Sequence, residues 1–112
     1  MSSARIVTDE SFAAEVLASQ RPVIVEYWAE WCGPCRMVAP VLDSIAADHA
    51  DQIDLVKVNV DENPATTRQY GILHVPTISL FAGGEVVKQV IGARSKSALL
   101  SEFGEFLERS VA

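Results

Sequence analysis

Two short apolar runs constrain the fold more than any other feature of this chain. VIVEYW at residues 23–28 and IDLVKVNV at residues 53–60 are rich in β-branched and aromatic residues, which is typical of buried strands. A further run, TISLFA at 77–82, joins EVVKQVI at 85–91 through two glycines, which favours a tight hairpin. Strands that alternate with helical patterns and finish in a hairpin and a helix predict an α/β fold, with a mixed sheet covered on both faces.

Capping residues and helical spacing predict where the helices begin. Thr8 is expected to cap a first helix, and a second should follow the cysteine pair. Asn63 with Pro64 indicates a third start, with the asparagine as cap, and Ser95 is expected to cap the last helix.

Length and charge limit the class of protein. The 112 residues suffice for one domain, which we expect to span 1–112. Fifteen acidic residues against nine basic ones give a net charge of −6, so nucleic acid and membrane partners are not expected. The N-terminus lacks a signal-peptide pattern and no apolar run has membrane-spanning length, which predicts a cytoplasmic protein. In that reducing compartment, two cysteines are expected to be catalytic or metal-binding before structural.

The only two cysteines, Cys32 and Cys35, are poorly placed for a structural clip or a metal site. A disulfide that closes so short a loop stabilises a fold by roughly 2 kcal/mol before strain is subtracted. A zinc site within the chain would need His49 and His74, and their spacing fits no finger or ribbon pattern, so no metal is expected. A zinc or iron–sulfur site shared between two chains stays open, without positive support.

A reactive cysteine pair has positive support. Cys32 falls where a strand gives way to a helix, and unpaired N–H groups and the helix dipole favour a thiolate there. Cys35, one turn further on, should be the more buried of the two, which gives an exposed attacker and a shielded resolver. Of the neighbouring tryptophans, we expect Trp28 in the core and Trp31 over the surface of the site.

WAEWCGPCRMVAP, residues 28–40, resembles the active-site segment of the thioredoxin family. Gly33-Pro34 between the cysteines is similar to the reductant members, whereas isomerases and oxidases usually have a histidine there. The resemblance extends over essentially the whole chain, through Lys57, Asn59-Val60-Asp61, Asn63-Pro64, Tyr70-Gly71-Ile72, Val75-Pro76-Thr77, Gly84-Glu85 and Gly92.

The resemblance implies a fold, an activity and partners. The fold would be a central five-stranded mixed sheet flanked by four helices. The activity would be protein-disulfide reduction in cell redox homeostasis, with electrons passed to cytosolic redox enzymes. Thioredoxin reductase would regenerate the protein, and NADPH and FAD would belong to that enzyme, so this chain would need no cofactor. Clients would include ribonucleotide reductase, peroxiredoxin and methionine sulfoxide reductase. The family and the acidic surface suggest a monomer.

Family positions also imply a substrate groove and a cis peptide bond before Pro76. The bond would present the Val75 backbone to Cys32, while the bare backbone of Gly92 would suit a docking peptide. The residues expected to line the groove are Trp31, Gly33, Pro34, Val75, Pro76, Gly92 and Ala93.

Glu26 and Lys57 are lone charges in runs that otherwise belong in a core. A buried, unpaired charge is costly, so we expect the two strands to lie side by side with these residues facing each other behind the cysteines. A buried carboxyl there could accept a proton from Cys35. The family has aspartate at this position, and glutamate is one methylene longer, about 1.5 Å. The alternative is that each charge sits at an exposed strand end.

Two further hypotheses stay open. His74 directly precedes Val75-Pro76; we interpret it as a surface residue, with a role in substrate choice or in tuning the Cys32 thiolate as the alternative. The rival to the reductase reading is a non-catalytic binding subunit that grips a partner through the same groove.

Overall fold

A five-stranded mixed sheet forms the centre of the protein. The computed structural model describes residues 4–109, and the strands follow the order β1-β3-β2-β4-β5 across the sheet. β1 and β2 run parallel to β3, whereas β4 is antiparallel to both β2 and β5. The strands are β1 (Arg5–Ile6), β2 (Val23–Trp28), β3 (Asp54–Asn59), β4 (Thr77–Ala82) and β5 (Glu85–Ile91). The mixed α/β sheet predicted from the sequence is therefore confirmed.

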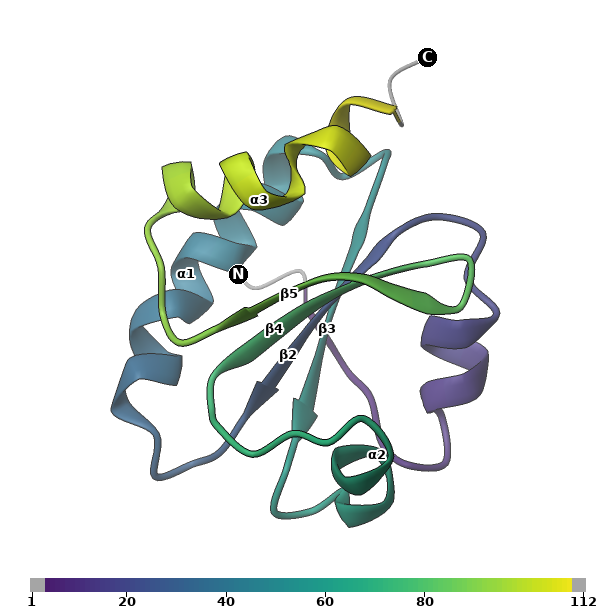
Figure 1. Cartoon of the computed structure of the whole chain (residues 1–112), viewed down its shortest axis with the longest axis vertical. Coiled ribbons are helices and arrows are strands. Elements are labelled where there is room, and N and C mark those ends of the chain that lie inside the picture. Colours follow the sequence, from purple (N-terminus) through teal and green to yellow (C-terminus); the bar gives the residue numbers. More distant parts are fainter. Residues whose placement is uncertain (1–3, 110–112) are drawn as a thin grey trace.

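Helices cover both faces of this sheet. They are the π-helix η1 (Ala13–Leu17) and the α-helices α1 (Gly33–Asp48), α2 (Pro64–Gln69) and α3 (Lys96–Arg109). Figure 1 shows α1 and α3 on one side of the sheet, and α2 with the N-terminal helix on the other. This arrangement buries both faces of the central strands, which explains why their sequences are almost continuously apolar.

The two-residue periodicity of β2 divides the core into two clusters. Ile24 points into the cluster formed with α1 and α3, which includes Leu42 and Phe103. Val25 and Tyr27 point into the opposite cluster with the N-terminal helix. Because alternate residues share a face, Glu26 lies on the α1 side of the sheet together with Ile24.

Two of the predicted local signals are confirmed. Gly83 and Gly84 have φ angles of 61° and 81°, so the β4–β5 hairpin uses the left-handed backbone that favours glycine. The Ser95 hydroxyl accepts the Ala98 N–H at 3.2 Å and so caps the start of α3.

The predicted cap at Thr8 is observed, in the turn that leads into the π-helix. Thr8 closes the turn that precedes the helix: its side chain accepts the Ser11 N–H at 3.3 Å, and its carbonyl accepts the Phe12 N–H at 2.9 Å. The π-helix then begins at Ala13 without a side-chain cap.

The predicted start of α2 at Asn63-Pro64 is confirmed, but the capping hydrogen bonds come from another residue. Asn63 occupies the N-cap position of α2, but its side chain makes no capping hydrogen bond. Asp9 supplies the cap from a distant part of the chain, because its carboxylate accepts the N–H groups of Ala65 at 3.1 Å and Thr66 at 2.8 Å. The Asn63 side chain instead accepts the Asp9 N–H at 2.8 Å and donates to the Asn59 carbonyl at 3.0 Å. The two residues thus fasten the N-terminal segment to α2.

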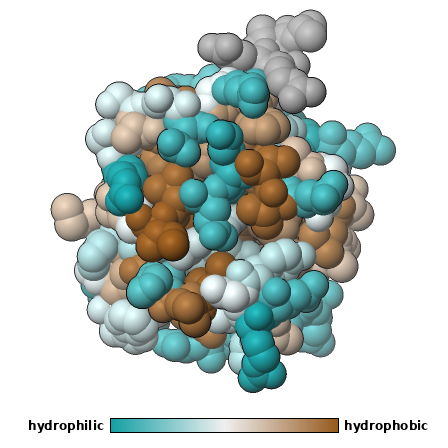
Figure 2. All heavy atoms as spheres, in the orientation of Figure 1, coloured by the Kyte–Doolittle hydropathy of each residue, from teal (hydrophilic) through white to brown (hydrophobic). Residues whose placement is uncertain are grey.

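Some large apolar side chains lie on the surface of the protein. On the face seen in Figure 2, hydrophobic residues form separate patches divided by hydrophilic ones. The large apolar side chains that are most exposed are Ile6, Trp31, Met37, Leu73, Val86 and Ile91. Within residues 4–109, none of the helices combines the length and the apolar character that crossing a bilayer requires.

Candidate active site

Cys32 and Cys35 form a disulfide at the N-terminal end of α1. Their Cα atoms lie 5.3 Å apart, and Cys32 is the N-cap residue of the helix. β2 leads into this turn and Pro34 lies in the first helical turn, where its missing N–H costs no hydrogen bond. Strand, turn and helix therefore fix both sulfur atoms, at the strand–helix junction that the sequence indicates.

The prediction of an exposed attacker and a shielded resolver is wrong for this disulfide state. Cys32 and Cys35 are each only 3% exposed. They form a small cluster with Ala29, against which Trp28, Val60 and Val75 pack. The bonded sulfur atoms also cover each other, so exposure does not distinguish the two cysteines.

The start of α1 can stabilise negative charge on Cys32. The Cys35 N–H donates to the Cys32 Sγ at 3.1 Å, as a capping group would require. No acidic residue lies in the first turn of α1, so nothing there opposes the positive end of the helix dipole. Hydrogen bonding of this kind and the dipole both favour a thiolate over a thiol.

The segment before β4 lies against the disulfide. The Val75–Pro76 peptide bond is cis, and the Val75 side chain packs against the cysteine cluster. The Gly92 N–H donates to the Pro76 carbonyl at 2.8 Å, and Gly92 has a φ of 93° that a larger residue would rarely adopt. These contacts bring the loop after β5 to the same edge of the molecule.

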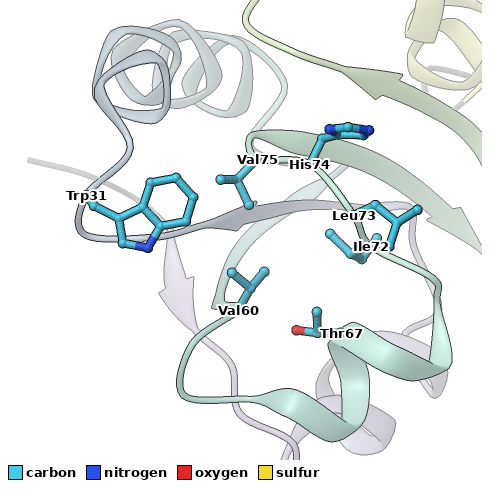
Figure 3. Close-up of a pocket in the computed structure, with 7 residues that line it drawn as sticks. All are labelled: Trp31, Val60, Thr67, Ile72, Leu73, His74 and Val75. Carbon is cyan, nitrogen blue, oxygen red and sulfur yellow. The ribbon is translucent and has the colours of Figure 1, made fainter.

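A cavity of about 310 Å³ opens beside the disulfide. Its lining residues are Trp31, Val60, Thr67, Ile72, Leu73, His74 and Val75. Figure 3 shows Trp31 and Val75 at one end of the hollow and Leu73 at the other, whereas the His74 ring points away from its centre. Trp31 is 68% exposed, and its indole N–H donates to the Asp61 carboxylate at 2.9 Å. The cavity is thus a largely apolar recess with a fixed aromatic wall.

The expected groove residues fall into two groups. Trp31 and Val75 line the cavity, while Gly33 and Pro34 are exposed at the first turn of α1. The other three (Pro76, Gly92 and Ala93) lie outside the cavity lining, and Ala93 packs against the main core. Sequence reasoning missed four lining residues: Val60, Thr67, Ile72 and Leu73. Leu73 is 86% exposed, and its place in the short segment between α2 and the Val75–Pro76 bond is the signal that could have identified it.

Glu26 lies in a second, smaller cavity behind the disulfide. This cavity of about 220 Å³ is lined by Glu26, Trp28, Cys35, Arg36, Ala39 and Lys57. Glu26 is only 1% exposed, and its Oε2 atom is buried without a hydrogen-bond partner in the structure. Burial therefore raises the pKa of Glu26 to about 7, with Lys57 opposing the rise and Asp43 adding to it. The longer side chain of glutamate still reaches the cavity that Cys35 shares.

The predicted strand pairing of Glu26 and Lys57 is observed, but not a direct ion pair. β2 and β3 are neighbours, and their register pairs Glu26 with Lys57. Glu26 is buried and Lys57 half-buried, so neither sits at an exposed strand end. No salt bridge or hydrogen bond joins them among residues 4–109; the Lys57 Nζ lies instead 4.8 Å from the centroid of the Trp28 ring.

The described part of the chain contains no group of three or more histidine, cysteine, aspartate or glutamate side chains placed to hold a metal ion. The groups that can take part in chemistry at this site are the two sulfur atoms, the N-terminus of α1, the carboxyl of Glu26 and the ammonium of Lys57. Together they can carry out thiol–disulfide exchange with an internal proton acceptor.

Comparison with known proteins gives a consistent result. The family model described as Thioredoxin matches residues 3–105. A thioredoxin of Streptomyces clavuligerus is 54% identical, over 84% of this chain and 87% of its own length. Thioredoxin 1 of Synechococcus elongatus is 51% identical, over 96% of this chain and all of its own. The bifunctional thioredoxin reductase/thioredoxin of Mycobacterium leprae is 48% identical over 88% of this chain, which corresponds to 22% of that protein. The chain therefore belongs to the thioredoxin family of thiol–disulfide oxidoreductases, and Cys32 and Cys35 form its redox-active disulfide.

Proposed function

We propose that the protein reduces disulfide bonds in client proteins, with Cys32 as the attacking residue and Cys35 as the resolving one. The observation that carries this assignment is the position of Cys32 as N-cap of α1, where its sulfur accepts the Cys35 N–H. A thiolate is favoured at that position and not one turn further into the helix.

Reduction proceeds in two exchange steps. The Cys32 thiolate attacks one sulfur of the client disulfide, forms a mixed disulfide and releases the other client sulfur as a thiolate. Cys35 then loses its proton, attacks the Cys32 sulfur and releases the second client sulfur. The client gains two electrons, and the protein is left with the Cys32–Cys35 disulfide seen in the structure.

Glu26 serves as the proton acceptor for Cys35 in the second step, with Lys57 as its charged neighbour. Both line the cavity that Cys35 shares. A carboxyl whose pKa is raised to about 7 can take up and release a proton near neutral pH, which is what a general base in this position needs. Lys57 lies close enough to favour the ionised carboxyl without contacting it.

Clients dock on the surface around the disulfide. We assign this surface to the seven groove residues expected from the sequence (Trp31, Gly33, Pro34, Val75, Pro76, Gly92 and Ala93), extended by the cavity beyond Trp31. The apolar walls of that cavity suit an apolar client side chain next to the target cysteine. His74 stays at its rim as a candidate for client selection.

The oxidised protein needs an external source of electrons. We propose that a thioredoxin reductase, which holds FAD and draws electrons from NADPH, regenerates the dithiol; the fused reductase/thioredoxin of M. leprae supports this pairing. Ribonucleotide reductase, peroxiredoxin and methionine sulfoxide reductase are the client classes we propose. We further propose a single domain over residues 1–112 that acts as a cytoplasmic monomer.

Insulin reduction in the presence of NADPH and thioredoxin reductase tests the assignment. Wild type should turn over, Cys32→Ser should be inactive, and Cys35→Ser should accumulate a mixed disulfide with the client. If Cys32→Ser reduces insulin at the wild-type rate, the assigned roles are wrong. Client binding that survives both substitutions, without wild-type turnover, would instead identify a binding subunit.

A further inference from the structure

Two side chains of β2 compete for the same lysine. Glu26 and Trp28 are two residues apart, so both point to the α1 side of the sheet. The β2–β3 register places Lys57 opposite Glu26 and diagonally beside Trp28. A flexible lysine side chain at this position can place its ammonium on either group.

In the structure the ammonium lies on the indole. The Lys57 Nζ is 4.8 Å from the centroid of the Trp28 ring, within the roughly 6 Å over which a ring face attracts a cation. The Glu26 Oε2 atom is buried without a hydrogen-bond partner, although both groups line the same cavity. The indole is thus the partner that Lys57 has taken, and the carboxyl next to it has been left without one.

We infer that Trp28 is a positioning residue that holds the Lys57 ammonium away from the Glu26 carboxyl, so that Glu26 remains able to take up and release the proton of Cys35. Direct contact with the ammonium would hold the carboxyl ionised and make it a weaker base. The inference rests on the proposed function only in taking Glu26 as the proton acceptor for Cys35. The arrangement of the three side chains is independent of it.

Other charges around Glu26 do not account for the arrangement. Arg36 lines the cavity from α1, but its guanidinium donates to the Glu30 carbonyl. Asp43, also on α1, acts on Glu26 through its negative charge and cannot replace the ammonium. On the other side, the sheet register places apolar Ile78 of β4 beside Glu26. Cys35 is the remaining titratable group, and in the oxidised protein it is held in the disulfide.

The test is the titration of the Glu26 carboxyl, followed by carbon-13 NMR in the oxidised protein. This form has no free thiol and needs no client, so the result does not depend on whether the protein is a reductase. With Trp28→Leu, the Glu26 midpoint should fall by about one pH unit, since an opposite charge in contact typically lowers a carboxyl pKa by 1–3 units. Trp28→Phe, which keeps a weaker ring face, should give a smaller fall.

The decisive comparison measures the effect of Trp28→Leu in a protein that also carries Lys57→Met. A smaller residue at position 28 also admits water, which by itself would lower the Glu26 midpoint. If Trp28 acts through the lysine, Trp28→Leu should shift the midpoint far less when Lys57 is already replaced. Trp31→Leu, which removes a tryptophan from the other cavity, should leave the Glu26 midpoint unchanged.

The inference is overturned if Trp28→Leu leaves the midpoint unmoved, or if it shifts the midpoint equally with and without Lys57. Should Trp28→Leu fail to fold, Trp28→Phe measured in both backgrounds carries the same comparison. A change in the pH profile of insulin reduction without any change in Glu26 titration would also contradict it. Trp28 would then affect the pH profile of insulin reduction without acting through the Glu26 carboxyl.

Discussion

Replacing Glu26 with glutamine should remove a pH-dependent loss of stability. The carboxyl is 1% exposed, and burial raises its pKa from an ordinary 4.5 to about 7 in the folded protein. Between these two values the folded state keeps the proton that the unfolded chain has already released. The free energy of unfolding must therefore fall as the pH rises through this interval.

The size of the effect follows from the two pKa values. The interval between 4.5 and about 7 is about 2.5 pH units, and each unit is worth 1.36 kcal/mol, so Glu26 costs the folded state about 3 kcal/mol at full ionisation. Below pH 4.5 none of this stability is lost, and above pH 7 the loss approaches its full value. Glutamine has a similar shape and does not ionise. Relative to wild type, Glu26→Gln should thus gain about 3 kcal/mol between pH 4.5 and pH 8.5.

Guanidinium denaturation of the oxidised proteins at several pH values measures this change. The oxidised state excludes contributions from the two thiols. Glu30→Gln is the matched control, because it makes the same chemical change at an exposed position, where no buried carboxyl is removed. A free-energy difference between Glu26→Gln and wild type that is constant from pH 4.5 to 8.5 would refute the reasoning.

Three further substitutions test other parts of the structure. Leu73→Ser should raise the KM for insulin about fivefold, the equivalent of about 1 kcal/mol of apolar contact, and leave both Tm and the reduction of a small disulfide such as DTNB unchanged, because Leu73 is 86% exposed. Gly92→Ala should destabilise the fold by about 1–2 kcal/mol in urea denaturation, because φ is 93° there; an unchanged midpoint would contradict the strain argument. Asp9→Ala should lower Tm at pH 7 by removing the cap of α2. This difference should shrink as the pH falls through the lowered pKa of Asp9, and a loss that persists in acid would contradict the capping role.

Most of the fold could be predicted because its signals are local. The apolar runs at 23–28 and 77–82 coincide with β2 and β4, and the glycine pair at 83–84 forms the predicted hairpin turn. The sequence carries no such signal for β1, because this strand consists of only two residues, Arg5 and Ile6, and both are exposed. Its place in the sheet depends on pairing with β3, which no pattern within five or six residues could encode.

What the sequence did not predict depends mainly on contacts between distant segments. Asn63 has the right residue type for a cap, but the α2 N–H groups bond to Asp9, more than fifty residues away in the chain. The lining residues of the cavity beside Trp31 come from the turn after β3, from α2 and from the segment before β4, so no single motif contains them. Cys32 is buried by Val75 and its neighbours, which a helix-start argument does not include.

The region around Glu26 separates what periodicity can predict from what it cannot. Strand spacing and charge were enough to expect that Glu26 and Lys57 would be neighbours, and the register bears this out. The same spacing also places Trp28 on the face that carries Glu26, so it brings two partners within reach of one ammonium. The partner of the ammonium is decided by the difference in free energy between its contact with a desolvated carboxyl and its contact with a ring face. Periodicity contains no information on that difference. A lone acid beside a lone base in a buried sheet is therefore evidence for adjacency, and the aromatic residue two positions away must be considered before an ion pair is assumed.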